Sequence, residues 1–369
     1  MTISAPYSIH QALGLAAQAL FLSNPNPRVG CVLVSPDGLL LGEGFTQQAG
    51  GPHAEVVALR AASAAGRDVR GATAYVTLEP CAHQGRTGPC CDALIASGIA
   101  KVVASLEDPN PSVAGQGFAR LRAAGVVVEV GPGAAESREL NIGFFSRMIR
   151  GTPWVRLKVA ASFDGTTALN NGVSQWITSP AARANGHAWR ARACAVLTGI
   201  GTVLDDNPRL DVREVATPRQ PHLVVVDSQL QTPIDARLFI ADRACYIYAA
   251  VQNDQKKAAL EARGATVIYL PNSQGKVDLK AMLHDLAHRG VNELHVEAGN
   301  RLNGSFVREG LVDEMLVYLA PKMLGAGRGL TNMGPFEAIS EGLDLTFTSI
   351  DRVGPDLRIV ARVPGRDAF

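Results

Sequence analysis

The feature that most constrains this chain is a histidine followed at a distance by two cysteines. His53 stands in the run Gly-Pro-His-Ala-Glu, Cys81 closes the run Leu-Glu-Pro-Cys, and Cys90 follows after a gap of eight residues. One imidazole and two thiolates can hold a zinc ion and leave its fourth tetrahedral position open for water. Zinc lowers the pKa of that water, so hydroxide is available near neutral pH. The spacing therefore predicts a catalytic zinc site.

Glu55 lies two residues after the first predicted ligand, and it has a role only if the site is catalytic. This spacing fits a carboxylate that shuttles protons, and nucleobase deaminases combine His-x-Glu with Pro-Cys and a second cysteine. A structural zinc site would need a fourth ligand, for which Cys91 is the nearby candidate. We assign Glu55 as the catalytic residue and His53, Cys81 and Cys90 as metal ligands, with Cys91 as the alternative to Cys90.

The same motif predicts where two helices begin. Residues two apart on a helix do not share a face, so His53 must stand at the very start of its helix, after Pro52. Cys90 follows Pro89 and opens an apolar run that ends at Gly98, and these are typical helix boundaries. Two ligands would then lie at helix N-termini, where partial positive charge favours thiolate over thiol.

Strand-like and helix-like segments alternate through the first 150 residues. The pattern predicts a helix over residues 9–22 and strands over residues 29–34, 39–45, 72–78, 101–105 and 126–130. It indicates an α/β sandwich with mostly parallel strands. Sheets of this kind bind ligands at the carboxyl ends of their strands, beside helix N-termini.

The second half continues the alternation and then ends differently. It predicts strands over residues 155–161, 191–198, 223–227, 245–249, 266–270 and 294–297. Three final strands, 316–320, 345–350 and 358–363, have no helices between them, which indicates antiparallel strands at a sheet edge. The stretch 140–150, closed by Gly-Thr-Pro, marks a boundary between a domain at 1–150 and a domain at 151–369.

Two glycine-containing turns follow strands in the second half. The run Gly199-Ile-Gly-Thr lacks the third glycine of a dinucleotide-binding fingerprint and is a weak signal. The run from Glu297 to Ser305 also follows a strand and opens a helix. Its small residues would let backbone amides approach an anion, although a tight turn with a glycine-permitted backbone explains them as well.

Five motifs occur in order along the first half: Asn-Pro-x-Val-Gly, His-Ala-Glu, Thr-Leu-Glu-Pro-Cys, Gly-Arg-Thr-Gly-Pro-Cys and Asp-Pro-Asn-Pro. Together they resemble the deaminase half of the bifunctional riboflavin-biosynthesis deaminase/reductase family. The second half resembles the reductase of the same family, through Lys-x-Ala-x-Ser at 158–162, Ser-Gln-Trp-Ile-Thr at 174–178 and Val-Glu-Ala-Gly at 296–299. The resemblance implies an N-terminal cytidine-deaminase-like α/β/α sandwich and a C-terminal dihydrofolate-reductase-like α/β domain.

The resemblance also implies two successive reactions. The first domain would hydrolyse an amino group from 2,5-diamino-6-(5-phosphoribosylamino)pyrimidin-4-one with the help of zinc. The second would use NADPH to reduce the ribosyl side chain to a ribityl one. Zn²⁺ and NADPH are therefore the expected cofactors, and a small phosphorylated pyrimidine is the expected substrate.

Ligand contacts are implied for particular residues. The deaminase substrate would be held by Asn26, His83, Arg86, Asp108 and Asn110. The cofactor would contact Ala160, Trp176, Thr202, Asp206, Gly299, Asn300, Arg301, Leu302, Asn303, Gly304 and Ser305. The reductase substrate would contact Lys158, Ser174, Arg190, Leu210, Arg213 and Glu297. Without the resemblance, Asn26 and Asn110 would be interpreted as turn residues, Trp176 as a core aromatic, and Arg190 and Arg213 as surface charges.

Composition and charge narrow the possible partners. The 369 residues carry a formal net charge of +1 and no polybasic run, which argues against a nucleic-acid partner. No apolar run approaches membrane-spanning length, and no Lys or Arg precedes the apolar segment 12–22, so we expect neither a membrane partner nor a signal peptide. Six cysteines without a disulfide pattern indicate the reducing cytoplasm. We further expect a homo-oligomer.

Two other functions fit part of the pattern. A nucleoside or nucleic-acid base deaminase with an accessory domain would require a basic channel for a single strand and would not bind a pyridine nucleotide. A module that zinc stabilises without catalysis would leave Glu55 dispensable.

Overall fold

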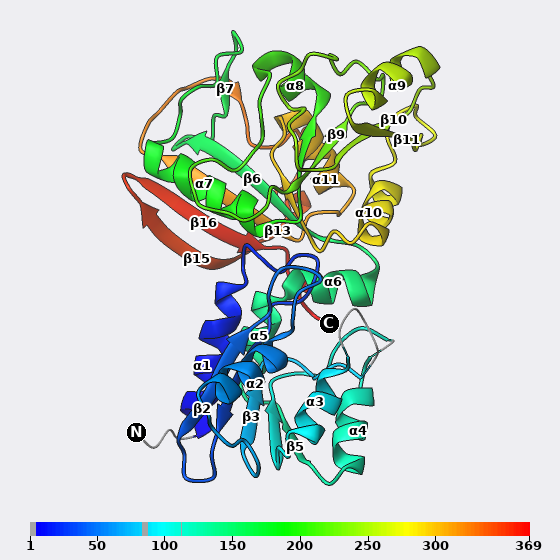
Figure 1. Cartoon of the computed structure of the whole chain (residues 1–369). Coiled ribbons are helices and arrows are strands. Elements are labelled where there is room, and N and C mark those ends of the chain that lie inside the picture. The colour runs from blue at the N-terminus through cyan, green and yellow to red at the C-terminus, as the bar shows by residue number, and fades with distance from the viewer. Residues whose placement is uncertain (1–4, 83–87, 112) are drawn as a thin grey trace. The chain divides into compact units, whose positions relative to one another are not determined.

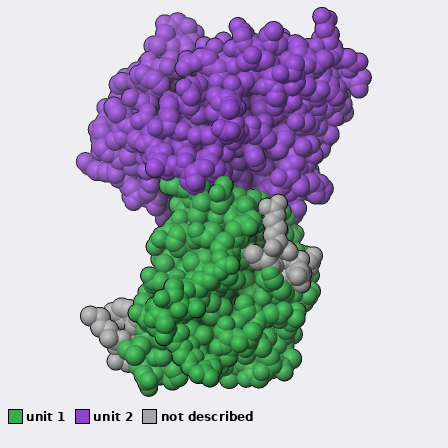
Figure 2. All heavy atoms as spheres, in the orientation of Figure 1, with its two compact units in different colours: residues 1–150 green, residues 151–369 purple. Residues whose placement is uncertain are grey.

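The computed structural model describes residues 5–82, 88–111 and 113–369 (Figure 1). The chain divides into two compact units, residues 1–150 and residues 151–369, which Figure 2 draws in different colours. Among the described residues, the first unit has a five-stranded sheet and the second a nine-stranded sheet. No helix in the described ranges has both the length and the apolar character needed to cross a membrane.

The strand order of the first sheet is β2-β1-β3-β4-β5. Its strands are β1 (Gly30–Val34), β2 (Leu40–Phe45), β3 (Thr73–Val76), β4 (Lys101–Ala104) and β5 (Val127–Val130). Strand β1 is antiparallel to both β2 and β3, whereas β4 is parallel to β3 and to β5. The prediction of mostly parallel strands is therefore wrong for two of the four pairings. A tight turn at Gly38 folds the chain directly back from β1 into β2, and β1 is also antiparallel to β3, which follows much later in the chain.

Helices cover both faces of this sheet. They are α1 (Ala5–Gln18), α2 (Ala54–Ala64), α3 (Cys90–Ala96), α4 (Gln116–Ala123), α5 (Ala134–Leu140) and α6 (Ile142–Arg150). A Cβ atom at Gly30 would lie 1.9 Å from the carbonyl oxygen of Ala12 in α1, and one at Gly44 would lie 2.7 Å from that of Ala54 in α2. Cys31 is the register partner of Gly44, so Gly30 and Gly44 lie on opposite faces. The two glycines therefore let α1 and α2 pack closely on opposite sides, which makes the predicted sandwich.

The second sheet has the order β11-β10-β9-β8-β12-β6-β13-β16-β15. Its strands are β6 (Trp154–Ser162), β8 (Ala195–Gly199), β9 (His222–Val226), β10 (Cys245–Ala249), β11 (Ala265–Tyr269), β12 (Glu293–Val296), β13 (Glu314–Ala320), β15 (Thr346–Val353) and β16 (Asp356–Arg362). The pairs from β11 to β13 are parallel, and β16 is antiparallel to both β13 and β15. The predicted antiparallel edge is confirmed. A separate two-stranded sheet joins β7 (Ala168–Leu169) to β14 (Gly327–Arg328).

Helices again alternate with the parallel strands. They are α7 (Pro180–Arg192), α8 (Ile200–Asp206), α9 (Asp254–Glu261), α10 (Leu279–His288) and α11 (Asn300–Arg308), with a short 3₁₀ helix at Ile339–Glu341. The predicted strand over 191–198 is wrong at its start, because residues 191 and 192 still belong to α7. The short, mostly apolar run here does not show where the helix ends and the strand begins. Strands β8 and β12 are neighbours, and each leads within a few residues into a helix, so one sheet edge collects two helix N-termini.

Candidate active sites

Three side chains of the kind that bind zinc converge in the first unit. The ligand atoms of His53, Cys81 and Cys90 all lie within 4.8 Å of one another. The Nδ1 atom of His53 is 3.6 Å from the Sγ atom of Cys81 and 3.3 Å from that of Cys90. Cys90 is buried and Cys81 is partly buried. One nitrogen and two sulfur donors at these separations suit a zinc ion held by three protein ligands.

The local sequence explains how these ligands meet. His53 is the N-cap of α2, and Cys90 is the first residue of α3, directly after the N-cap Pro89. The backbone N–H of Cys90 donates to the Sγ atom of Cys81 at 3.4 Å. The predicted helix starts are confirmed. Cys91 points elsewhere, because its thiol donates to Oδ1 of Asp92 at 3.7 Å.

The groups of this cluster have their pKa values shifted in different directions. Glu55, only 4% exposed in the first turn of α2, has its pKa raised to about 7 by burial and by the nearby charge of Cys81. Hydrogen bonds from Cys90 and His53 lower the pKa of Cys81 to about 4, although burial opposes the shift. A hydrogen bond with Cys81 raises the pKa of Cys90, and another raises the pKa of His53. A carboxyl group that exchanges a proton near neutral pH therefore lies beside the ligands, as general acid–base catalysis requires.

The structure describes part of the predicted deaminase substrate site. Asn26 lies in a turn, where its backbone N–H donates to the carbonyl oxygen of Ser23 at 2.8 Å. Asp108 is 8% exposed and accepts a hydrogen bond from the backbone N–H of Asn110 at 2.8 Å, so these two residues share one loop. The other two predicted contacts, His83 and Arg86, lie outside the described residues.

Sequence reasoning missed Glu79, which connects Cys81 with the loop that carries Asp108. Its side chain is 4% exposed, and its two carboxylate oxygens accept hydrogen bonds at 2.8–3.2 Å from the backbone N–H groups of Asp108, Gly115, Gly117 and Phe118. A carboxylate here also suits the N-terminus of α4. The signal in the sequence was an acidic residue between a buried strand and a predicted metal ligand, where a charge needs several partners.

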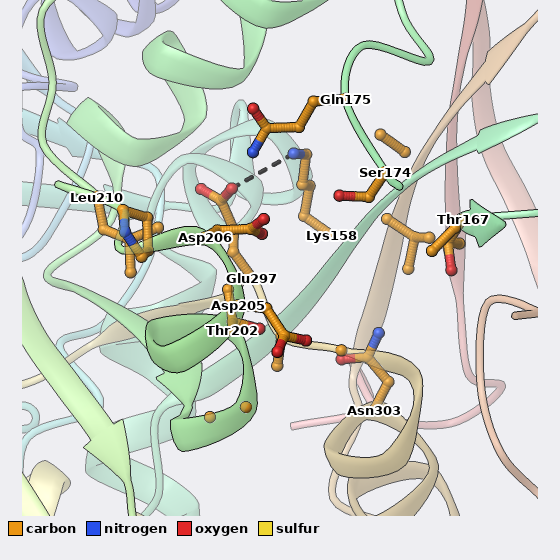
Figure 3. Close-up of a pocket in the computed structure, with 18 of the residues that line it drawn as sticks. Lys158, Thr167, Ser174, Gln175, Thr202, Asp205, Asp206, Leu210, Glu297 and Asn303 are labelled. Carbon is orange, nitrogen blue, oxygen red and sulfur yellow. Dashed lines mark hydrogen bonds and ion pairs between the residues drawn. The ribbon is translucent and has the colours of Figure 1, made fainter. Parts of the chain in front are cut away.

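A cavity of about 1310 Å³ opens in the second unit at the sheet edge formed by β6, β8 and β12 (Figure 3). Its lining includes nearly every predicted cofactor residue: Ala160, Trp176, Thr202, Asp206, Gly299, Asn300, Arg301, Leu302, Asn303 and Ser305. It also includes the predicted substrate residues Lys158, Ser174, Arg190, Leu210, Arg213 and Glu297. Pockets for one small molecule measure roughly 300–1,000 Å³, so this volume suits a cofactor together with a substrate.

Gly304 is the predicted cofactor residue that does not line the cavity. A Cβ atom there would lie 2.0 Å from the carbonyl oxygen of Asn332, so the glycine serves the packing of α11. Gly299 differs, because the nearest atom to its Cβ position is Oγ1 of Thr202 at 3.9 Å. Gly299 is the N-cap of α11 without a side-chain cap, which leaves first-turn N–H groups for an anion such as a dinucleotide pyrophosphate.

A charged cluster lies on the cavity wall. The carboxylate of Glu297, whose side chain is 11% exposed, accepts two hydrogen bonds from Arg190, one of them at 2.9 Å, and lies 3.3 Å from Nζ of Lys158 (Figure 3). The buried His295 approaches it from the sheet, with Nε2 3.4 Å from Oε1. Burial disfavours the ionised form of Glu297, but the positive charges of Arg190 and Lys158 hold the pKa of this carboxyl group well below its ordinary value. Glu297 is therefore an ionised carboxylate between two cations.

Two alternative interpretations of single residues are wrong. Trp176 is 62% exposed, so it is not a core aromatic, and the guanidinium of Arg183 lies 4.4 Å from the centre of its ring. The side chain of Arg190 is only 14% exposed, so it is not a solvated surface charge. Both residues line the cavity.

Comparison with known proteins connects both units with described families. Residues 153–359 match the model of the RibD C-terminal domain. Residues 4–106 match the model of the cytidine and deoxycytidylate deaminase zinc-binding region.

Similar proteins extend over nearly the whole chain. The riboflavin biosynthesis protein RibD of Escherichia coli (strain K12) is 45% identical over 365 residues, which is 95% of this chain and 97% of that protein. The structure of Acinetobacter baumannii RibD, form 1, has a TM-score of 0.88 at 40% identity and covers 97% of this chain and 98% of that one. A Thermotoga maritima structure described as a diaminohydroxyphosphoribosylaminopyrimidine deaminase/5-amino-6-(5-phosphoribosylamino)uracil reductase has a TM-score of 0.86 at 30% identity, with the same coverage.

Proposed function

Because this chain belongs to the RibD family of riboflavin biosynthesis, which joins a zinc-dependent deaminase to an NADPH-dependent reductase, we propose that residues 1–150 catalyse the deamination and residues 151–369 the reduction. The substrates that we assign are those in the description of the Thermotoga relative. The alternative of a nucleoside or nucleic-acid base deaminase with an accessory domain is wrong, since residues 153–359 match the RibD C-terminal domain.

The observation that carries the deaminase assignment is a buried, protonatable Glu55 beside the cluster of His53, Cys81 and Cys90. Zinc, when bound by these ligands, supplies water that is activated for attack near neutral pH. Glu55 accepts a proton at one carboxylate oxygen and returns it to the departing amino group. The loop with Asp108 and its neighbours holds the pyrimidine edge through hydrogen-bond donors and acceptors.

In the reductase cavity NADPH supplies the hydride, and the protein supplies binding and orientation. The N-terminus of α11, with Gly299, binds the cofactor pyrophosphate. Lys158, Arg190 and Glu297 orient the ribosyl group, because Glu297 stays ionised and can accept hydrogen bonds from its hydroxyls. Arg213, whose side chain is 47% exposed, contacts the phosphate.

Glu55→Gln tests this division of labour. The amide keeps the shape of the side chain but cannot carry the proton, so deamination should fall by about 10²-fold or more. NADPH oxidation with supplied deaminated substrate should be unchanged. Glu43→Gln, which alters an exposed glutamate in the same unit, is the matched control. Deamination at the wild-type rate in Glu55→Gln would refute the role of Glu55.

We also propose the cytoplasm as the location, a small phosphorylated pyrimidine as the partner rather than a nucleic acid or a membrane, and a homo-oligomer as the assembly. All six cysteines are free, which suits a reducing compartment. Strand β15 supports self-association, because it is an edge strand that exposes Phe347 by 64% and Ile350 by 57%.

A further inference from the structure

Residues 209–213 pass along the reductase cavity without forming a helix or strand, and side chains from other elements hold their backbone. Arg243 donates to the carbonyl oxygens of Arg209 and Leu210 at 2.7 Å each. Gln220 accepts a hydrogen bond from the backbone N–H of Val212 at 2.8 Å and donates to its carbonyl oxygen at 2.9 Å. Nδ1 of His187 accepts a hydrogen bond from the backbone N–H of Arg213 at 3.3 Å. Leu210 has φ +49°, a conformation that non-glycine residues keep only where their surroundings enforce it, most often at functional sites. The segment is therefore held in one shape.

Asp211 stands at the centre of this segment and gathers three arginines. Its side chain is 4% exposed, with Oδ1 2.6 Å from a guanidinium nitrogen of Arg213 and Oδ2 2.9 Å from one of Arg209. Its carbonyl oxygen accepts a hydrogen bond from Arg190 at 2.9 Å. All three arginines line the cavity, whereas Asp211 does not. Asp211 therefore binds all three arginines without lining the cavity itself.

The charges around Asp211 do not balance. Glu297 already neutralises Arg190, so the single carboxylate of Asp211 faces both Arg209 and Arg213. The side chains of these two arginines are 48% and 47% exposed, which leaves N–H groups available to a ligand in the cavity. Planar guanidinium groups bind phosphate oxygens in pairs of parallel hydrogen bonds. The surplus positive charge suits a phosphate monoester.

We propose that Asp211 is a positioning residue for the reductase substrate, which fixes Arg209 and Arg213 so that their free N–H groups meet the substrate phosphate. Arg209 is then a further phosphate contact, one that the family resemblance does not assign. The inference rests on the proposed function, which gives Arg213 to the substrate. Two arginines that are ordered before binding lose little rotamer freedom on binding, so the carboxylate contributes to affinity without touching the ligand.

Asp211→Asn tests the proposal, because an amide keeps the shape but loses the charge and turns an N–H group toward one arginine. The KM for the phosphorylated substrate should rise about tenfold, as expected for the loss of a charge-assisted hydrogen bond. The kcat and the NADPH affinity should be unchanged. With the same substrate lacking its phosphate, Asp211→Asn and the wild type should have equal KM values. Arg209→Gln should show the same pattern. When Asp211→Asn and Arg209→Gln are combined, the rise in KM should be smaller than the two separate effects together, since the two residues act on the same phosphate contact.

Asp313→Asn is the matched control. It alters a second buried carboxylate of the same unit, which pairs with Arg366 at 2.7 Å and does not line the cavity. Thermal unfolding of both variants measures the loss of stability separately from the change in KM. If Asp211→Asn does not fold, Arg209→Gln carries the test, because that side chain is half exposed.

The outcomes separate this inference from the function on which it rests. If the wild type has the same KM for substrate with and without phosphate, the proposed phosphate contact itself is wrong. If the wild type distinguishes the two and both Asp211→Asn and Arg209→Gln distinguish them equally well, the roles of Asp211 and Arg209 are wrong, while the phosphate contact of Arg213 stands. An equal rise in KM for both substrates in Asp211→Asn would also overturn the proposal, since it would indicate a general distortion of the cavity.

Discussion

At the scale of single residues, two adjacent cysteines at the start of α3 have opposite surroundings. The Sγ atom of Cys90 faces His53 at 3.3 Å, whereas burial raises the pKa of Cys91 to about 11 and its thiol contacts Asp92. We expect about one zinc per purified chain. Cys90→Ser should lose the zinc, and Cys91→Ser should keep most of it, as measured by elemental analysis. Equal loss of metal in both variants would show that the ligand was assigned to the wrong cysteine.

His187 makes the stability of the second unit depend on pH. It is 4% exposed, and burial together with the charges of Arg190 and Arg213 lowers its pKa to about 4. An unfolded histidine has a pKa of about 6.5, so between these values the unfolded chain binds a proton that the folded chain does not. The free energy of unfolding should therefore fall from about pH 6.5 to about pH 4.

Urea denaturation at pH 7 and pH 5 measures this dependence. His187→Asn keeps an acceptor near the Nδ1 position but does not titrate, so its unfolding free energy should fall less between the two pH values. His288→Gln, at an exposed histidine of the same unit, should behave like the wild type. A wild-type decrease that persists in full in His187→Asn would assign the effect to other groups.

At the scale of elements, the sequence predicted best where local chemistry decides. Proline before Cys90 and the ligand spacing at His53 correctly located the starts of α3 and α2, because capping and φ restriction act within a few residues. The antiparallel pairing of β1 with β3 was missed, since pairing depends on residues far apart in the chain. Glu79 was missed for the same reason, because its partners lie about 30 to 40 residues further along the chain. Asp211 was missed although Arg209 and Arg213 are close in sequence, because nothing in the sequence shows that this carboxylate is buried behind a cavity.

Two glycines, one at the N-cap of α11 and one within the helix, have different roles, which can be separated by experiment. At Gly299 a Cβ atom has room in the protein, so Gly299→Ala should keep the thermal stability and weaken NADPH binding, because the added methyl group intrudes on the ligand. At Gly304 the same atom would meet a backbone oxygen at 2.0 Å, so Gly304→Ala should destabilise the unit by about 1–3 kcal/mol. Thermal unfolding and fluorescence titration with NADPH measure the two effects. The reverse pattern would show that Gly304, and not Gly299, approaches the cofactor.

At the scale of the whole molecule, the open edge of β15 predicts self-association. Phe347→Asp combined with Ile350→Asp places charges on that strand and should shift the chain toward monomer, because unpaired apolar edge strands are sites of pairing between copies. Analytical ultracentrifugation of the wild type and the variant measures the shift. Ile339→Asp removes a fully exposed apolar side chain outside the strand and serves as the control. An unchanged sedimentation coefficient in the double variant would exclude this strand as the interface.

The four backbone hydrogen bonds of Glu79 also affect how the two activities can evolve. Through this carboxylate, the segment that ends in Cys81 and the loop that begins at Asp108 are tied into one body. A substitution that shifts one should therefore shift the other, so we expect changes here to alter metal affinity together with the proposed binding of the pyrimidine. The arginines around Asp211 belong to a different unit, with a core of its own. Natural selection can therefore adjust the reduction step without altering the deamination step that precedes it.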